Sequence, residues 1–153
     1  MRAGGIGMDA LDQAILGELK QNARASASEI SRKVNLSVPA VAERIRKLEN
    51  AGIIAGYAVR VDREKAGQAL LAFLLVRIGG TENAKAFRQD IIRHACVLEC
   101  HHVTGAYDYL LKVAAADVKA LEQFITGTLK AVKGVLDTNT MISLQTVKEE
   151  INV

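Results

Sequence analysis

Positively charged and short polar side chains recur at helical spacing between residues 38 and 50. One face of this segment is apolar and consists of Val38, Val41, Ile45 and Leu48. A helix that turns this stripe inward presents its opposite face to solvent. The side chains on that outer face are Pro39, Ala40, Glu43, Arg46, Lys47 and Asn50, with Arg44 on the flank.

These residue types suit contact with double-stranded DNA. Lys and Arg side chains neutralise backbone phosphates and release counterions. Short polar side chains near a helix start can reach base edges, which fits Ser37, and Glu43 can accept from cytosine. Ala40 can touch a thymine methyl group. The alternative, which periodicity alone leaves open, is a solvated basic helix of an interaction domain.

The residues before this segment predict how it is positioned. Ser26 and Glu29 have the spacing of a capping box, in which each side chain satisfies a backbone donor at a helix start. Asn35 tolerates the left-handed conformation that a sharp turn needs, and Ser37 can cap the next helix. The predicted helices run over residues 9–22, 27–34 and 38–50. This arrangement describes a helix-turn-helix, whose last helix enters the major groove.

The second half of the chain changes character and predicts a separate domain. Its pattern reads as strand 70–78, helix 82–93, strands 96–103 and 107–114, helix 117–129 and strand 134–144. That order is the split βαβ, ferredoxin-like βαββαβ arrangement. The predicted class is therefore α+β, with a helix-turn-helix domain over residues 9–56, an extended linker over 57–68 and a ferredoxin-like domain over 69–147.

The charge is divided unevenly between these halves. The formal net charge of +3 lies entirely in residues 1–60, because residues 61–153 hold equal numbers of acidic and basic side chains. A local basic excess is the expected footprint of a nucleic-acid partner. No signal peptide and no membrane-length apolar run is evident, so we expect a cytoplasmic protein with no membrane partner.

Both halves resemble the Lrp/AsnC, or feast/famine, family of transcription regulators. In the first half the matching residues are Leu11-Asp12, Arg24-Ala25-Ser26, Glu29-Ile30, Asn35-Leu36-Ser37, Val41, Glu43-Arg44-Ile45, Leu48-Glu49 and Ala51-Gly52-Ile53-Ile54. In the second half they are the run Val103–Leu111, Gly134-Val135, Thr138 and Thr140. The resemblance covers residues 9–147. The presence of both halves, in this order and at this separation, is highly specific for the family.

The resemblance implies a regulator that binds DNA through its first domain. The second domain, the RAM or AsnC type, dimerises in that family, and dimers assemble into tetramers or octamers. Many members bind an amino acid in a cleft between dimers. The effector residues implied here are Thr104, Gly105, Tyr107, Asp108, Thr138 and Thr140. Many members carry Ser-Pro at the start of the reading helix, whereas Val38 separates Ser37 from Pro39 here, so base contacts transfer poorly.

The chemistry of the effector loop agrees with this implication. Gly105 lets backbone N–H groups approach a ligand carboxylate closely, and the Asp108 carboxylate suits an ammonium group. The alternative interpretation is that Gly105 only makes the hairpin turn and that Asp108 bonds its own backbone.

Three other interpretations carry less weight. One is a metal site formed by Cys96, Cys100, His101 and His102, with His94 nearby. A regular strand would place Cys96, Leu98, Cys100 and His102 on one face and Glu99 and His101 on the other. That spacing would spread the metal ligands apart. An enzyme like the sirohaem decarboxylases would use His101 or His102. An architectural protein would wrap DNA with little sequence preference. We expect no metal, no cofactor and no enzymatic activity, and the role of the cysteines and histidines stays open.

Overall fold

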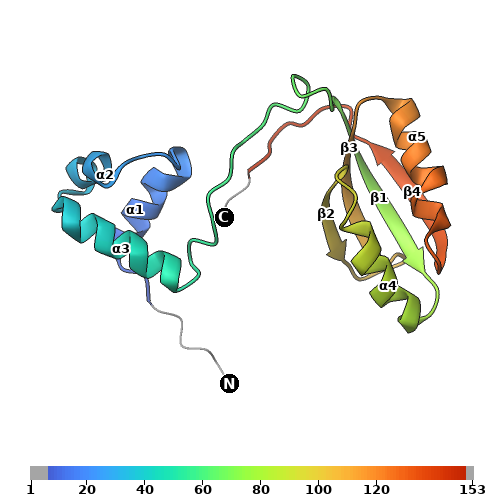
Figure 1. Cartoon of the computed structure of the whole chain (residues 1–153), viewed down its shortest axis with the longest axis horizontal. Coiled ribbons are helices and arrows are strands. Elements are labelled where there is room, and N and C mark those ends of the chain that lie inside the picture. Colours follow the sequence, from blue (N-terminus) through green and yellow to red (C-terminus); the bar gives the residue numbers. More distant parts are fainter. Residues whose placement is uncertain (1–6, 151–153) are drawn as a thin grey trace. The chain divides into compact units, whose positions relative to one another are not determined.

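The structure is a computed structural model that describes residues 7–150 in two compact units (Figure 1). One unit contains α1 (Ala10–Gln21), α2 (Ala27–Val34) and α3 (Val38–Asn50). The other runs from Val61 to Glu149. Its elements are β1 (Leu70–Ile78), α4 (Thr81–Ile91), β2 (Val97–His102), β3 (Tyr109–Ala115), α5 (Val118–Gly127), the 3₁₀ turn η1 (Leu129–Ala131) and β4 (Val135–Ile142).

Side-chain caps set the bounds of the first helices. The Ser26 hydroxyl accepts from the Glu29 N–H, and the Glu29 carboxylate accepts from the Ser26 N–H, so the predicted capping box is present. Asn35 has a φ of 53° and ends α2 in the left-handed conformation, as its type predicts. Because these local signals coincide, α2 and α3 begin and end at the predicted residues.

The small core of this unit is aliphatic and is formed by Ile15, Leu19, Ile30 and Val41. Val38 was expected in it, but its side chain is 44% exposed. Val118 shows the same difference in α5, where it was expected to point inward and is 61% exposed. Both residues stand at the first position of a helix. Because Cβ atoms tilt toward the helix N-terminus, such a side chain leans past the end of the helix and away from the core.

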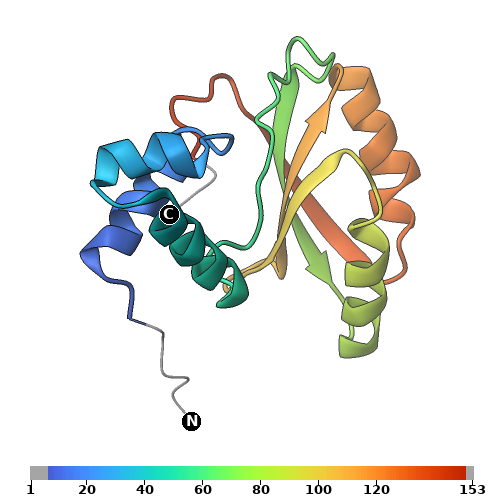
Figure 2. The same ribbon diagram turned by 60° about the vertical axis from the view of Figure 1, so that its left-hand side comes forward.

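The second unit is a four-stranded antiparallel sheet in the order β2-β3-β1-β4, which confirms the predicted ferredoxin-like topology. Helices α4 and α5 lie on the same face of the sheet (Figure 2). Alternate residues of β1, namely Ala72, Leu74 and Val76, pack with Phe87 of α4 and Leu121 of α5 in one core. The residues between them, Leu71, Phe73 and Leu75, therefore belong to the opposite, open face of the sheet.

An irregularity in β2 changes which of its residues share a face. Val97 is paired with Val113, and after a register shift Glu99 is paired with Lys112, so Leu98 is the extra residue of a bulge. Cys100 and His102 then lie opposite Leu111 and Tyr109. The expectation that Leu98 shares a face with Cys100 is wrong, because the bulge reverses the alternation at that point.

Gly134 closes the junction between β4 and the loop after β1. It adopts a φ of +91° and its carbonyl accepts from the Gly79 N–H at 2.8 Å. A Cβ at Gly134 would overlap the side chain of Asn83.

Within residues 7–150, no helix is both long and apolar enough to cross a membrane.

We predict that Gly134→Ala destabilises the protein by about 2 kcal/mol, because alanine adds backbone strain at positive φ and overlaps Asn83. The measurement is urea unfolding followed by circular dichroism. Gly127→Ala is the matched control, since the space around that helical glycine is open, and it should be neutral or slightly stabilising. Equal midpoints for the two variants would contradict this account of Gly134.

Candidate functional site

The outer face of α3 carries fewer free charges than its composition indicates. Pro39, Arg46 and Lys47 are exposed as predicted, and Ser37 caps the helix by accepting from the Ala40 N–H. Glu43, however, forms an ion pair with Arg46 at 2.5 Å and approaches Lys47 at 3.8 Å. Pairs of this kind on a helix surface are weak. Glu43 therefore orders the two cations without removing them from contact with a phosphate.

Arg44 has a different environment from the other basic residues of α3. Its guanidinium donates to Asp9 at 2.8 Å and to Asp12 at 2.7 Å. Asp9 and Asp12 also form the capping box of α1, so the ion pairs tie α3 to the start of α1. The Asp12 N–H and then Arg44 hold the pKa of Asp9 below its usual value. A phosphate contact by Arg44 remains a prediction, and it would compete with two carboxylates.

A hollow lies beside these groups, between the start of α1 and α3. Ala40, Glu43 and Lys47 line it together with Asp12 and Arg44. Ala40 is accordingly half-buried, whereas Pro39 and Arg46 are exposed. A partner that lies against α3 would meet Pro39 and Arg46 before it reaches Ala40.

The predicted effector loop connects β2 to β3 and is closed by backbone hydrogen bonds. The Val103 N–H donates to the Asp108 carbonyl, and the Asp108 N–H donates to the Val76 carbonyl, both at 2.9 Å. The Asp108 carboxylate accepts from the Ile78 N–H at 2.7 Å. Gly105 has a φ of +118° with open space around it. One oxygen of Asp108 thus anchors the loop to β1. The backbone group that it binds belongs to the neighbouring strand and not to the loop itself.

The sheet brings β4 to the same end of β1 as this loop. Thr138 is paired with Val76, whose carbonyl also accepts from Asp108. Thr140 lies two pairs further along, opposite Leu74. Tyr107 is half-buried, while Thr104 and Gly105 are exposed at the tip of the loop. The loop and Thr138 therefore flank β1 from its two edges, and Thr140 is the predicted effector residue farthest from the loop along the sheet.

The histidines of β2 have partners within the sheet, and Cys96 and Cys100 pack partly buried against the core. His102 stacks on Tyr109 with ring centroids 5.1 Å apart, and His101 lies 3.0 Å from Glu99. Burial raises the pKa of the Cys96 and Cys100 thiols, which disfavours the reactive thiolate. Across residues 7–150, no three or more His, Cys, Asp or Glu side chains are grouped so as to hold a metal ion.

Comparison with known proteins agrees with this architecture. The chain matches the AsnC-type helix-turn-helix domain over residues 8–49 and the Lrp/AsnC ligand-binding domain over residues 71–153. It is 33% identical to the transcriptional regulator AzlB of Bacillus subtilis over 97% of this chain and 96% of that protein. It is also 33% identical to the leucine-responsive regulatory protein of Escherichia coli K12, over 95% and 90% of the two chains.

Solved structures show the same likeness. A transcriptional regulator of Neisseria meningitidis, solved with L-methionine, superposes with a TM-score of 0.93 at 31% identity over 96% of each chain. The feast or famine regulatory protein of M. tuberculosis, complexed with L-methionine, gives 0.88 at 28% identity, over 96% of this chain and 99% of that one.

A helix-turn-helix joined to a ferredoxin-like ligand-binding domain defines a DNA-binding transcription regulator. The chain belongs to the Lrp/AsnC family.

The contacts of Arg44 lead to a prediction that separates its two roles. If Arg44 orients α3 through Asp12, Asp12→Asn should weaken DNA binding several-fold, and Arg44→Ala should do the same. If Arg44 contacts a phosphate, Asp12→Asn should strengthen binding, because it frees the guanidinium and removes a negative charge. We expect the first result in fluorescence anisotropy with labelled duplex DNA.

Glu18→Gln serves as the control, because it also removes a carboxylate that pairs with a cation from α1, away from the capping box. Tighter binding by Asp12→Asn than by the unaltered protein would contradict the orienting role.

Proposed function

We propose that this regulator responds to an amino acid bound at the β2–β3 loop and acts on DNA in the cytoplasm. The observation that carries the proposal is the loop itself, with Gly105 at positive φ and Asp108 held against β1. Open space at Gly105 leaves room for backbone N–H groups to meet a carboxylate. The second oxygen of Asp108 is then available to an ammonium group. The methionine complexes of two relatives support an amino acid as the effector.

The proposed effector site comprises Thr104, Gly105, Tyr107, Asp108, Thr138 and Thr140. Thr138 and the loop converge on Val76, and Thr104 and Gly105 are exposed. A ligand at this end of the sheet would therefore have one side open, which a second copy of the chain can cover. That arrangement would make ligand binding depend on assembly, and assembly on the ligand.

On the DNA side, we propose that α3 enters the major groove with the outer face predicted from the sequence. Arg46 and Lys47 would contact phosphates, Ser37 and Glu43 would face base edges, and Pro39 and Ala40 would pack against the groove. The exposed Val38 adds an apolar contact beside Pro39. Arg44 would serve this interface indirectly, because its ion pairs with Asp9 and Asp12 orient α3 against α1.

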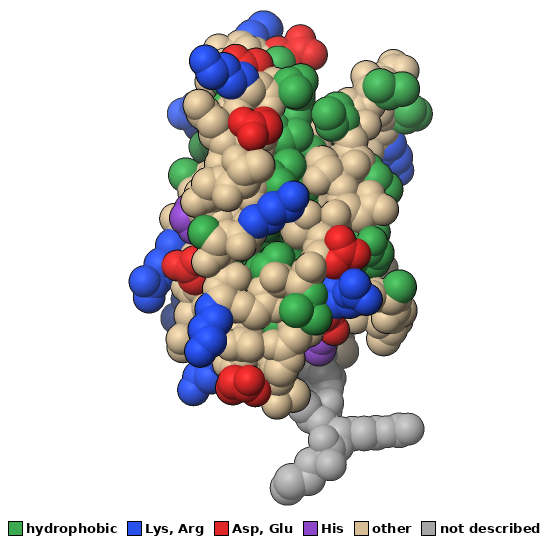
Figure 3. Space-filling view, turned by 90° about the vertical axis from the view of Figure 1, so that its right-hand side faces the viewer, with side chains coloured by type: hydrophobic (Ala, Val, Ile, Leu, Met, Phe, Trp, Pro, Cys, Tyr) green, Lys and Arg blue, Asp and Glu red, His purple; other side chains and the backbone are tan. Residues whose placement is uncertain are grey.

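The open face of the sheet supports a homodimer that can assemble further to tetramers or octamers. Leu75 is paired with Leu110, and both are half-buried, so apolar side chains from two strands lie side by side on it. Met141 of β4 extends this face and is 47% exposed. Hydrophobic side chains also reach the surface elsewhere among charged ones (Figure 3). Contact between two open faces would bury the apolar surface that a single chain leaves half-exposed.

We predict that Asp108→Asn abolishes the response to an amino acid while the protein stays folded. Asparagine keeps an oxygen that can accept from the Ile78 N–H but loses the charge that an ammonium group requires. The measurement is a thermal-shift screen of the twenty amino acids, beginning with L-methionine. A ligand at a hundred times its dissociation constant stabilises the unaltered protein by about 2.7 kcal/mol.

Asp117→Asn is the control for this screen, because it alters an aspartate that caps α5 by accepting from Ala120. Stabilisation of Asp108→Asn equal to that of the unaltered protein would remove Asp108 from the effector site. No stabilisation of the unaltered protein by any amino acid would contradict the proposed effector class.

We predict that Leu75→Lys converts the dimer to a single chain of 16.5 kDa, because it places a charge in the centre of the open face. Val118→Lys is the control, since it adds the same charge at an exposed position of α5 on the helical side. Light scattering at micromolar concentration gives the masses. A Leu75→Lys protein that remains dimeric would place the interface elsewhere.

A further inference from the structure

A group of charged side chains on the second unit has no part in the proposed effector site or in the proposed DNA-binding face of α3. The Arg63 guanidinium donates to both oxygens of Glu149, at 3.1 and 2.8 Å. The Lys112 ammonium donates to Glu149 and, at 3.0 Å, to Glu99. We call Arg63, Glu99, Lys112 and Glu149 the Glu149 cluster. Its first and last members are 86 residues apart in the chain.

The Glu149 cluster is better shielded from water than most surface ion pairs. The side chains of Arg63, Lys112 and Glu149 are 25%, 14% and 23% exposed. Lys112 and then Arg63 lower the pKa of Glu149 to about 2, so this carboxylate is charged throughout the physiological range. Glu149 thus accepts from a single nitrogen of Arg63, Nη1, and from the Lys112 ammonium. The cluster is therefore suited to holding two segments in one position.

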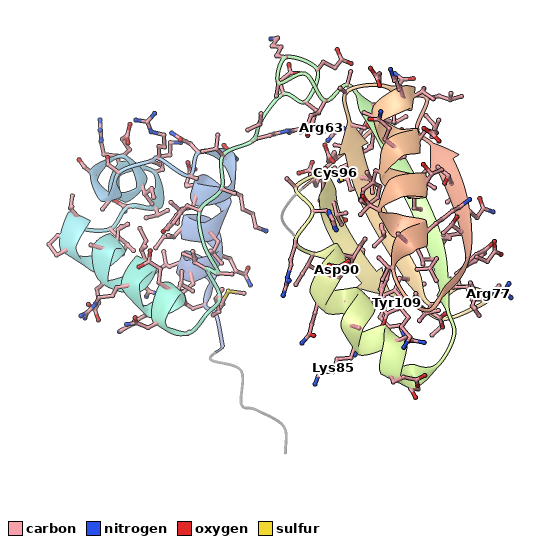
Figure 4. The ribbon with its side chains drawn as sticks, turned by 45° about the vertical axis from the view of Figure 1, so that its right-hand side comes forward. Arg63, Arg77, Lys85, Asp90, Cys96 and Tyr109 are labelled. Atoms are coloured by element: carbon pink, nitrogen blue, oxygen red, sulfur yellow. The ribbon has the colours of Figure 1, made fainter. Side chains whose placement is uncertain are left out.

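The segments it holds are the two ends of the sheet unit. Arg63 opens a turn over residues 63–67, in which the Gln68 N–H donates to the Arg63 carbonyl at 2.8 Å. Arg63 lies at the end of the sheet where β1 begins (Figure 4). Glu149 follows the segment after β4, in which the Ser143 N–H donates to the Leu71 carbonyl of β1 at 2.8 Å. Lys112 belongs to β3 and holds Glu149 on the open face of the sheet, and Glu149 in turn holds Arg63.

The position of Arg63 decides how much chain is free before the sheet. Residues 55–62 carry no helix, strand or turn, and Ile54 still packs on the helical core. With Arg63 held, the connection is residues 55–62, in which the Tyr57 hydroxyl donates to Glu49 of α3 at 2.9 Å. With Arg63 released, it can extend to Ala69, the residue before β1, which nearly doubles its length. Since effective concentration falls roughly as the −3/2 power of linker length, the second DNA contact of a dimer would weaken about threefold.

We infer that Glu149 is a positioning residue for DNA binding: by holding Arg63 and Lys112, it fixes the point at which the connection to the helix-turn-helix leaves the sheet. Glu149 thereby limits the distance between half-sites that a dimer can occupy. The inference rests on the proposed homodimer and on the DNA-binding role of the family. Glu149 acts on spacing, and the face of α3 that meets the bases is unaffected.

The experiment compares the full-length protein with Glu149→Gln, which keeps the shape of the side chain and removes its charge. The probe is a duplex selected from a random pool by the unaltered protein, with its half-site placed singly or in pairs at stepped separations. We expect Glu149→Gln to bind the single half-site normally and the best pair about threefold more weakly, with a flatter dependence on separation. Arg63→Gln should behave in the same way.

Glu64→Gln is the control, because it removes an exposed carboxylate from the same turn. Hydrogen exchange of residues 62–68, measured without DNA, should be faster in Glu149→Gln than in either the control or the unaltered protein. A variant that exchanges at the normal rate, or that keeps the normal dependence on separation, would overturn the inference. An equal loss at single and paired half-sites would also overturn it, since that result indicates damage to the reading domain.

Absence of DNA binding by the unaltered protein would instead overturn the DNA-binding role, and the inference with it. If light scattering shows that the unaltered protein is monomeric and it still binds paired half-sites, that result would contradict only the proposed homodimer.

Discussion

The second unit depends on the burial of β1, which is hydrogen-bonded to β3 on one edge and to β4 on the other. Its nine residues include only one charged side chain, Arg77. Such a strand cannot lie at the edge of a sheet without exposing apolar surface. Its central place brings the β2–β3 loop and β4 to the same end of the sheet, where Val76 accepts from Asp108 and is paired with Thr138. The effector hypothesis thus rests on a packing requirement as much as on the loop.

Local signals explain what could be predicted from the sequence. The bounds of α2 and α3 follow from Ser26, Asn35 and Ser37, each of which acts on its own few neighbours. The order of strands follows from the apolar patterns, since a strand as apolar as β1 must be central. The capping box of Asp9 and Asp12 could have been read from its spacing, and so could the pairs that Glu43 makes with Arg46 and Lys47.

Other features depend on residues that are distant in the chain. The bulge at Leu98 is a matter of register with β3, which no pattern within β2 reveals. The meeting of Arg63 with Glu149 requires the whole sheet to be assembled first. The hold of Arg44 on Asp9 and Asp12 depends on how α3 packs against α1. Periodicity reports which side of an element is apolar, and it does not report which charged groups then meet.

The pairing of Glu43 with Arg46 and Lys47 has a consequence for how this regulator searches along DNA. Both cations stay within reach of phosphates, but the carboxylate between them lowers the net positive charge that this helix face offers. Fewer counterions are then released by contact at an arbitrary sequence, and such contact is weak. A protein that leaves wrong sequences quickly samples more of a genome in a given time. Glu43 of α3 would therefore shorten the time for which the protein stays bound at each non-specific site.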